Sequence, residues 1–532
     1  MNKRNISLTL IVALAYAARI EAQVIQSAPR LVVNITIDQL RSDYLEAFSP
    51  LYGSYGFKRL LSEGRVYTNA SFPFQPIDRA SAITAILTGA PPYYNSIVAE
   101  RWLDRNTLRP VYCVDDNKYK GLGTEAGSSP KNVLTSTIGD ELKVYSQGKA
   151  IVYSIAPTRD AAVLSAGHAA DAAIWIDDES GEWCSSTYYD KELPKWASEY
   201  NRLYPALKEI AGKEWTPDNY YTGNFTYFMV KNTQTTFSHK FNSDRRYREY
   251  KASALVNDNV TKTALHCIKS TDMGKDGITD MLNLTYYAGN FDHSTLSECQ
   301  LEMQDTYVRL DKQIAALISG IELILGQKTV MYVITSTGYS DEEGNDYTKY
   351  KVPTGIFYIN RTANLLNMYY GALWGQARYV DTYLGNQIYL NHQLLENKRI
   401  SIADATQRAQ EFLSMVAGIR NVYTGQQLLS NTNPNIHKIR NGFSQERCGD
   451  IIVEVNPGWR VLNEDNMENT LSRASYIQFP IIMFGCGVKA GRIDDNVTVD
   501  RIAPTLSKSI RIRAPNACSS EPLFLRKNAN NQ

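Results

Sequence analysis

The segment from Leu31 to Gln39 combines a continuous apolar run with a carboxylate near its end, Asp38. A short run of this kind is typical of a strand that is buried on both faces, as in a parallel sheet covered by helices. Ligands of open α/β sheets bind at the carboxyl ends of the strands. Asp38 is therefore predicted to lie at the edge of the sheet where a binding site would form.

Further apolar runs follow the same pattern, and helical segments separate several of them. Such recurrent strand and helix units predict an α/β fold with a largely parallel central sheet and helices on both faces. The runs are 150–155, 281–287, 330–335 and 477–484. We expect one domain from residue 23 to 532, with insertions outside the sheet at about 100–217 and 354–440. The first insertion is rich in Trp and Tyr, which makes it a candidate interface.

Residues 1–22 have the pattern of a secretory signal peptide: a basic head, an apolar stretch and a small residue, Ala22, before the expected cleavage point. We therefore expect a periplasmic or secreted protein. No later run approaches the roughly 20 apolar residues of a membrane span. The formal net charge of +1, without long charge runs, argues against nucleic acid or an anionic membrane as the main partner. A protein or a small molecule is the expected partner.

The chain has seven cysteines, without a CxxC pair or zinc-ribbon spacing. In an oxidising compartment Cys267 could pair with Cys299, or Cys113 with Cys184. Sequence alone does not fix the connectivity, and the odd number leaves one thiol over.

Eight blocks of the sequence resemble the phosphate-irrepressible periplasmic alkaline phosphatases, which are zinc enzymes of the alkaline phosphatase superfamily and relatives of the type I phosphodiesterases. The resemblance runs from about Leu31 to Ala517 and implies an alkaline-phosphatase-like α/β/α sandwich with inserted cap regions. The blocks are 38–45, 56–64, 129–142, 166–175, 186–196, 273–284, 305–318 and 441–451.

The resemblance also implies a threonine nucleophile that is bound to zinc at the amino end of a helix. The shared T-x-I-x-T-G ending, here Thr84 to Gly89, aligns Arg79 with that nucleophile. Arginine cannot attack phosphorus, and its fixed positive charge would repel a zinc ion. Ser81, two residues further along the helix, and Thr84 should point elsewhere.

The expected metal ligands are replaced as well. Tyr286 and Asn290 stand where the family has an Asp and a His, and Ser336 and Thr337 stand where it has an Asp-His pair. The stretch 468–475, where the last His is expected, contains none. Asp38 is the one ligand retained. A dizinc site needs roughly six to eight donors around two ions about 4 Å apart, so we expect no metal cofactor.

The positions that bind phosphate in the family carry added carboxylates. Glu100 replaces an Asn, and Thr158, Arg159 and Asp160 replace a Lys-Asp-Arg sequence. These changes disfavour an anionic substrate. Without zinc, Asp38 would be buried and unpaired, which costs several kcal/mol. We therefore expect an ion pair between Arg79 and Asp38 in place of the metal.

One other group suggests a metal site, the dipeptide of Asp292 and His293, although a surface or capping pair is the simpler interpretation. Asp341 belongs to an acidic loop that is expected to be solvated.

Three functions remain open. The first is a catalytically inactive, exported homologue that binds or scaffolds protein partners in the cell envelope. The second is a metal-dependent phosphomonoesterase or phosphodiesterase with a rearranged site. The third is a protein that binds a small anion without hydrolysing it.

Overall fold

The computed structural model describes residues 28–225, 236–296, 298–341, 351–430, 433–471 and 477–525. The expected signal peptide and residues 472–475 of the His-free stretch lie outside these ranges. Among the described residues, no helix is long and apolar enough to cross a membrane.

A ten-stranded sheet in the order β21-β2-β20-β12-β1-β11-β6-β7-β8-β5 forms the centre of the molecule. Its middle strands, from β12 to β7, run parallel to one another. The prediction of a mixed α/β fold with a largely parallel sheet is confirmed. The strand of the last predicted run, β20, instead pairs antiparallel with β12 and β2. The strands are β1 (Leu31–Asp38), β2 (Arg65–Ser71), β5 (Gly121–Leu122), β6 (Val152–Ala156), β7 (Ala172–Ile176), β8 (Trp183–Ser186), β11 (Asp280–Tyr287), β12 (Val330–Ser336), β20 (Phe479–Gly485) and β21 (Gly491–Thr498).

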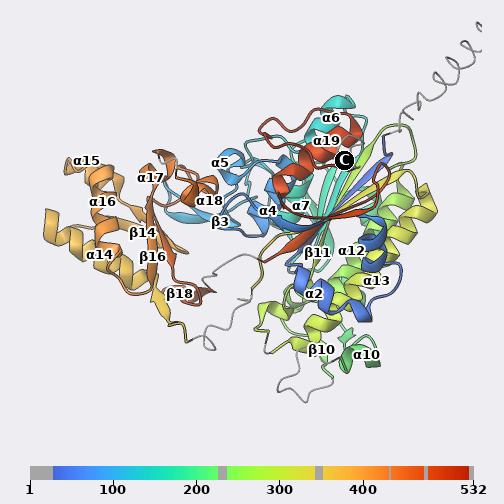
Figure 1. Cartoon of the computed structure of the whole chain (residues 1–532), viewed down its shortest axis with the longest axis horizontal. Coiled ribbons are helices and arrows are strands. Elements are labelled where there is room, and N and C mark those ends of the chain that lie inside the picture. The colour runs from blue at the N-terminus through green and yellow to red at the C-terminus, as the bar shows by residue number, and fades with distance from the viewer. Residues whose placement is uncertain are drawn as a thin grey trace, which may run out of the picture.

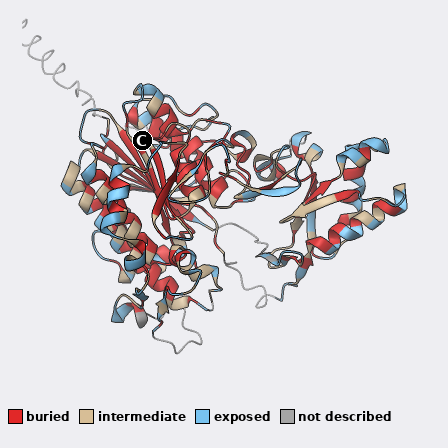
Figure 2. Ribbon diagram, turned by 180° about the vertical axis from the view of Figure 1, so that it is seen from behind, coloured by how far each residue is buried: buried red, intermediate tan, exposed pale blue. Residues whose placement is uncertain are grey.

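Strand β1 is buried along its whole length, and its alternate side chains enter two different cores. One core lies under helices α2, α3, α8, α12 and α13, and the other lies under α4, α6, α7 and α19. Figure 1 shows α2, α12 and α13 on one face of the sheet and α4, α6, α7 and α19 on the other, and Figure 2 shows the buried strands between them. The fold is therefore a three-layer α/β/α sandwich. The helices are α2 (Ser42–Ala47), α3 (Phe57–Glu63), α4 (Arg79–Thr88), α6 (Ile138–Tyr145), α7 (Arg159–Ala166), α8 (Lys195–Leu203), α12 (Leu255–Ser270), α13 (Gln300–Leu325) and α19 (Ile502–Ile510).

The parallel register brings the ends of three strands to one edge. Asp38 at the end of β1 lies opposite Tyr287 of β11, and Ile37 lies opposite Ser336 of β12. Thr337 is the next residue after β12. The side chains that the sequence placed at a strand end therefore meet at the carboxyl edge of the sheet.

The expected insertion at 100–217 does not form one body outside the sheet. Strands β6, β7 and β8 within it belong to the central sheet, and Trp175 and Trp183 are buried in its cores. The aromatic residues that suggested an insertion thus partly belong to the hydrophobic interior. A two-stranded hairpin does leave the sheet, formed by β3 (Arg101–Asp104) and β4 (Arg109–Tyr112).

A second body contains the expected insertion at 354–440 and extends beyond it to Leu471. It has its own hydrophobic core under helices α14 (Ile359–Trp374) and α16 (Ile402–Leu413), and it lies to one side of the sandwich in Figure 1. The boundary lies later than expected because β17 and β18 pair with strands that precede residue 440. Its strands are β13 (Ile356–Tyr358), β14 (Val380–Leu384), β15 (Gln387–Leu390), β16 (Ile419–Thr424), β17 (Ile451–Val455), β18 (Arg460–Asn463) and β19 (Glu468–Leu471).

The seven cysteines all lie in the described ranges and form no disulfide, and all except Cys518 are buried. Neither of the pairings left open by the sequence, Cys267 with Cys299 or Cys113 with Cys184, is formed.

Candidate functional site

The amino end of α4 holds Arg79 at the carboxyl edge of the sheet. Asp78 caps this helix, since its carboxylate accepts hydrogen bonds from the backbone N–H of Ser81 (2.9 Å) and from the Ser81 hydroxyl (2.7 Å). The same carboxylate accepts the backbone N–H of Glu100. Asp78 thereby fixes the start of α4 and ties the segment of Glu100 to it.

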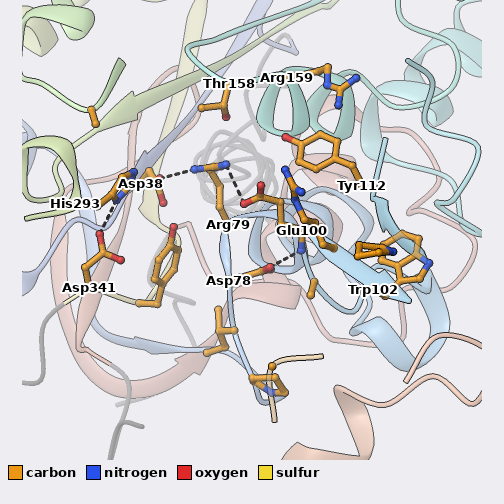
Figure 3. Close-up of a pocket in the computed structure, with 18 of the residues that line it drawn as sticks. Asp38, Asp78, Arg79, Glu100, Trp102, Tyr112, Thr158, Arg159, His293 and Asp341 are labelled. Carbon is orange, nitrogen blue, oxygen red and sulfur yellow. Dashed lines mark hydrogen bonds and ion pairs between the residues drawn. The ribbon is translucent and has the colours of Figure 1, made fainter. Parts of the chain in front are cut away.

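The guanidinium of Arg79 contacts the carboxylates of Asp38, Glu100 and Asp160, and Figure 3 shows the first two of these contacts. Its Nε and Nη2 donate to the two oxygens of Asp160 at 2.8 and 3.1 Å. Its Nη1 lies 3.6 Å from Asp38 Oδ2, and its Nη2 lies 3.4 Å from Glu100 Oε2. The expected ion pair between Arg79 and Asp38 is confirmed, but the bidentate contact with Asp160 is the closer one. From the sequence we expected Asp160 to disfavour an anionic substrate, and we did not predict its ion pair with Arg79.

Burial and charge act in opposite directions on these acids. Burial tends to raise the pKa of Asp160, but the charge and hydrogen bonds of Arg79 outweigh it, so that the pKa is lowered. For Asp38 burial prevails over the more distant Arg79, and its pKa is raised. Asp160 is therefore the firmly ionised partner of Arg79.

Asp38 also accepts a hydrogen bond from the Thr337 hydroxyl at 2.8 Å, and the Thr337 oxygen accepts the backbone N–H of Gln39 at 2.9 Å. The structure thus brings five of the predicted site residues into one contact network, which we call the Arg79 cluster. Its members are Asp38, Arg79, Glu100, Asp160 and Thr337.

Of the other four predicted residues, three make different contacts. The Tyr286 and Thr261 hydroxyls share a hydrogen bond of 2.9 Å, Asn290 donates to the carbonyl of Ser294 at 2.9 Å, and Ser336 donates to the carbonyl of Leu40 at 2.8 Å. Thr158 lies directly before α7, but its side chain does not cap the amino end of that helix. It lines the cavity described below. Tyr286, Asn290 and Ser336 therefore serve the local structure around the strand ends.

The side chains of Asp292 and His293 contact different partners. His293 Nδ1 lies 2.8 Å from Asp341, whose hydrogen bond raises the pKa of His293 against the effect of burial. Asp292 pairs with Arg245 at 3.3 Å. These two residues therefore do not converge on a common point as metal ligands would.

The donors around Asp38 do not fit zinc. A zinc ion binds a carboxylate oxygen at about 2.0–2.2 Å and needs further N, O or S ligands. Beside Asp38 lie the guanidinium of Arg79 and the hydroxyl of Thr337 instead. Within the described ranges, no group of three or more His, Cys, Asp or Glu side chains is placed to hold a metal ion.

A cavity of about 1030 Å³ opens above the Arg79 cluster and is lined by both bodies of the molecule. The sandwich contributes the strand ends, the start of α4 and the hairpin β3–β4, and the second body contributes 384–387 and Tyr389. The sequence did not identify Trp102, Tyr112 or Tyr389 as lining residues. The many aromatic residues in the segment after Glu100 could have indicated Trp102 and Tyr112 as lining residues.

The three-layer sandwich, with charged side chains at the carboxyl edge of its parallel strands, belongs to a chain that resembles proteins of the alkaline phosphatase superfamily. The chain belongs to the type I phosphodiesterase / nucleotide pyrophosphatase family, whose model matches residues 32–477.

Two curated relatives cover almost the whole chain. Alkaline phosphatase PhoV of Synechococcus elongatus is 27% identical over 503 residues, which are 92% of this chain and 91% of that protein. A protein of Myroides odoratus named calcium-transporting ATPase is 28% identical over 93% of this chain and 94% of its own length. Among solved structures, alkaline phosphatase PafA superposes with a TM-score of 0.81 at 24% identity, over 93% of this chain and 98% of that one. The similarity to the PafA structure supports the assignment of the fold.

Proposed function

We propose that the protein is an exported, catalytically inactive member of its family that acts by binding, as a ligand-binding or scaffolding protein of the cell envelope. The observation that carries this proposal is the guanidinium of Arg79 at the start of α4, held by Asp160, Asp38 and Glu100. A phosphoryl-transfer site needs a nucleophile and cations at this edge of the sheet. At this edge of the sheet stands Arg79 instead. Its guanidinium cannot attack phosphorus, and the carboxylates of Asp160, Asp38 and Glu100 already neutralise its charge.

The neighbouring hydroxyls support the same proposal, because each already donates a hydrogen bond within the protein. Ser81 donates to Asp78 at 2.7 Å, Thr84 donates to the carbonyl of Ala80 at 2.8 Å, and Thr337 donates to Asp38 at 2.8 Å. Thr84 is held by a carbonyl, which is not a base, and the carboxylates that Ser81 and Thr337 contact are already engaged by the amino end of α4 and by Arg79. Export is supported by the expected signal peptide.

The names of the relatives favour a second candidate, a phosphomonoesterase or phosphodiesterase with a rearranged site, since PhoV and PafA are named as alkaline phosphatases. Such an enzyme would need ligands other than the residues around Asp38. The third candidate, a binding site for a small anion, is weakened by Glu100 and Asp160, which already occupy the donors of Arg79.

The test is zinc content by mass spectrometry on protein purified without chelators, together with hydrolysis of p-nitrophenyl phosphate and bis-p-nitrophenyl phosphate with and without added zinc. PhoV, prepared in the same buffers, serves as the active control. We expect folded protein with neither bound zinc nor turnover. Near-stoichiometric zinc with turnover that a chelator abolishes would overturn the proposal and establish the second candidate.

A further inference from the structure

The cavity above the Arg79 cluster has the dimensions and walls of a small-molecule site. Its volume of about 1030 Å³ lies at the upper end of the range of ligand pockets. Aromatic rings of the hairpin β3–β4, of β15 and of the sheet edge line it: Trp102, Tyr112, Tyr287, Tyr339 and Tyr389. Such walls suit a ligand with an apolar or aromatic body.

The floor of this cavity carries more negative than positive charge. Asp38, Asp78 and Glu100 line it beside the guanidinium of Arg79, and the carboxylate of Asp160 holds that guanidinium from outside the lining. An anion that entered here would meet uncompensated carboxylates, whereas a cation would neutralise one of them.

The cations at the rim do not reverse this balance, because most of them have acidic partners. Arg159 contacts Asp115 at 2.7 Å, Arg245 contacts Asp292 at 3.3 Å, and both Arg248 and Lys251 contact Asp178. Arg101, which also lines the cavity, lies against the ring of Tyr112, so the carboxylates without a bidentate cationic partner lie at the floor.

Glu100 is the accessible member of the cluster. Its side chain is 39% exposed, against 3% for Asp38 and 0% for Asp160. Its contact with Arg79 is long at 3.4 Å, which leaves acceptor capacity for a donor that arrives from the cavity. Burial raises the pKa of the Tyr112 hydroxyl, and Asp160, Cys113 and Glu100 add to the increase. Figure 3 shows Glu100 between Arg79 and the side chains of Tyr112 and Trp102.

We propose that this cavity binds an organic cation, a primary ammonium group on an aromatic or apolar body, and that the Glu100 carboxylate receives the ammonium. The proposal rests on the proposed loss of hydrolysis and names the class of ligand that the remaining cavity takes. An ammonium group supplies donors and charge to Glu100, while its apolar body packs against the rings of the wall. A phosphate ester of the same size would place its charge against the same carboxylate.

Three probes that share a phenyl ring and differ in the charge of their polar group test this proposal by isothermal titration calorimetry: benzylamine, benzyl alcohol and phenyl phosphate. Benzylamine is cationic at neutral pH, benzyl alcohol is neutral and phenyl phosphate is anionic. We expect saturable binding of benzylamine, and affinity lower by about tenfold or more for the other two probes. Binding of phenyl phosphate as tight as that of benzylamine, equal binding of benzyl alcohol, or no binding of benzylamine would each overturn the proposal.

A matched pair of variants places the effect in the cavity. Glu100→Gln keeps the size of the side chain and removes its charge, and we expect it to lower the affinity for benzylamine by about tenfold. The control is Glu454→Gln, because Glu454 is 31% exposed, lies 3.5 Å from Arg420 and is not part of the cavity lining. The control should bind as the wild type does, and an equal loss in both variants would overturn the assignment to Glu100.

Zinc content and p-nitrophenyl phosphate turnover, measured on the same samples, separate the two proposals. Turnover with bound zinc would refute the loss of hydrolysis, whereas the calorimetric comparison alone decides the class of ligand.

Discussion

At the scale of single residues, the contact between Arg79 and Asp160 governs the stability of the sheet edge. Asp160 is fully buried, so the loss of Arg79 would leave a buried carboxylate without its cation. Removal of one partner from a buried ion pair typically costs about 3–5 kcal/mol, whereas replacement of both partners is often close to neutral. The stability of the site therefore depends on the pair more than on either residue alone.

We accordingly expect Arg79→Met to lower the free energy of unfolding by about 3–5 kcal/mol, measured by denaturant unfolding. The double variant Arg79→Met/Asp160→Asn should recover at least about 1 kcal/mol of this loss. Arg492→Met serves as the control, because Arg492 and Asp494 are both exposed, and its unfolding midpoint should not change. Additive effects of Arg79→Met and Asp160→Asn would contradict the proposed coupling.

Glu100 makes the stability depend on pH. Burial and Asp160 raise its pKa to about 7, against the opposing effect of Arg79, while Asp78 adds to the increase and Arg101 reduces it. The folded state thus holds a proton that the unfolded state releases near pH 4.5. The contribution of Glu100 is fully present below about pH 4.5 and is lost as the pH rises through about 7.

The expected result is that Glu100→Gln unfolds at a higher temperature than the wild type at pH 8, and that this difference shrinks as the pH falls toward about 4.5. Thermal unfolding of both proteins across this range measures the difference. A difference that does not vary with pH would mean that Glu100 does not titrate within this window.

At the scale of helices and strands, the start of α4 is held by the carboxylate of Asp78. The loss of an N-cap side chain typically costs about 1 kcal/mol, and here the backbone N–H of Glu100 would lose its acceptor as well. We expect Asp78→Ala to lower the free energy of unfolding by about 1–3 kcal/mol, with a smaller loss for Asp78→Asn, which keeps an oxygen for the cap. Thr137→Ala, at the capping box of α6, is the reference for a cap remote from Arg79. If Asp78→Ala lowers the free energy of unfolding by no more than Thr137→Ala does, the hydrogen bond between Asp78 and the backbone of Glu100 does not contribute to stability.

The elements that the sequence predicted best are the buried parallel strands. Strands β1, β11 and β12 are continuous apolar runs, and their carboxyl ends had to meet once they paired in parallel. The antiparallel direction of β20 was not predicted, because an apolar run does not specify its direction. The contact between Arg79 and Asp160 also escaped prediction, since these residues start different helices and meet only when β6 takes its place in the sheet.

At the scale of the whole molecule, the cavity exists because the second body lies against the hairpin β3–β4. Arg105 of that hairpin contacts Asp450 at 3.2 Å and donates to the carbonyl of Cys448, and Arg447 donates to the carbonyl of Ser96 at 2.8 Å. From the sequence we predicted a body near 354–440, but its position relative to the hairpin could not be predicted. That position depends on contacts between elements that are far apart in the sequence. The lining by residues 384–387 was therefore not predictable.

The proposed replacement of a metal by Arg79 predicts that the whole molecule keeps its stability when metal is removed. A metal that binds only the folded state stabilises it by about 2.7 kcal/mol at one hundred times its Kd, so a metal-dependent fold loses stability in a chelator. Here the cation that Asp38 and Asp160 require belongs to the chain itself. We expect the same thermal unfolding temperature in EDTA, in metal-free buffer and with added zinc, with PhoV as the parallel sample. Unfolding at a lower temperature in EDTA, reversed by zinc, would mean that the folded chain holds a metal through residues other than these, and the role assigned to Arg79 would then be wrong.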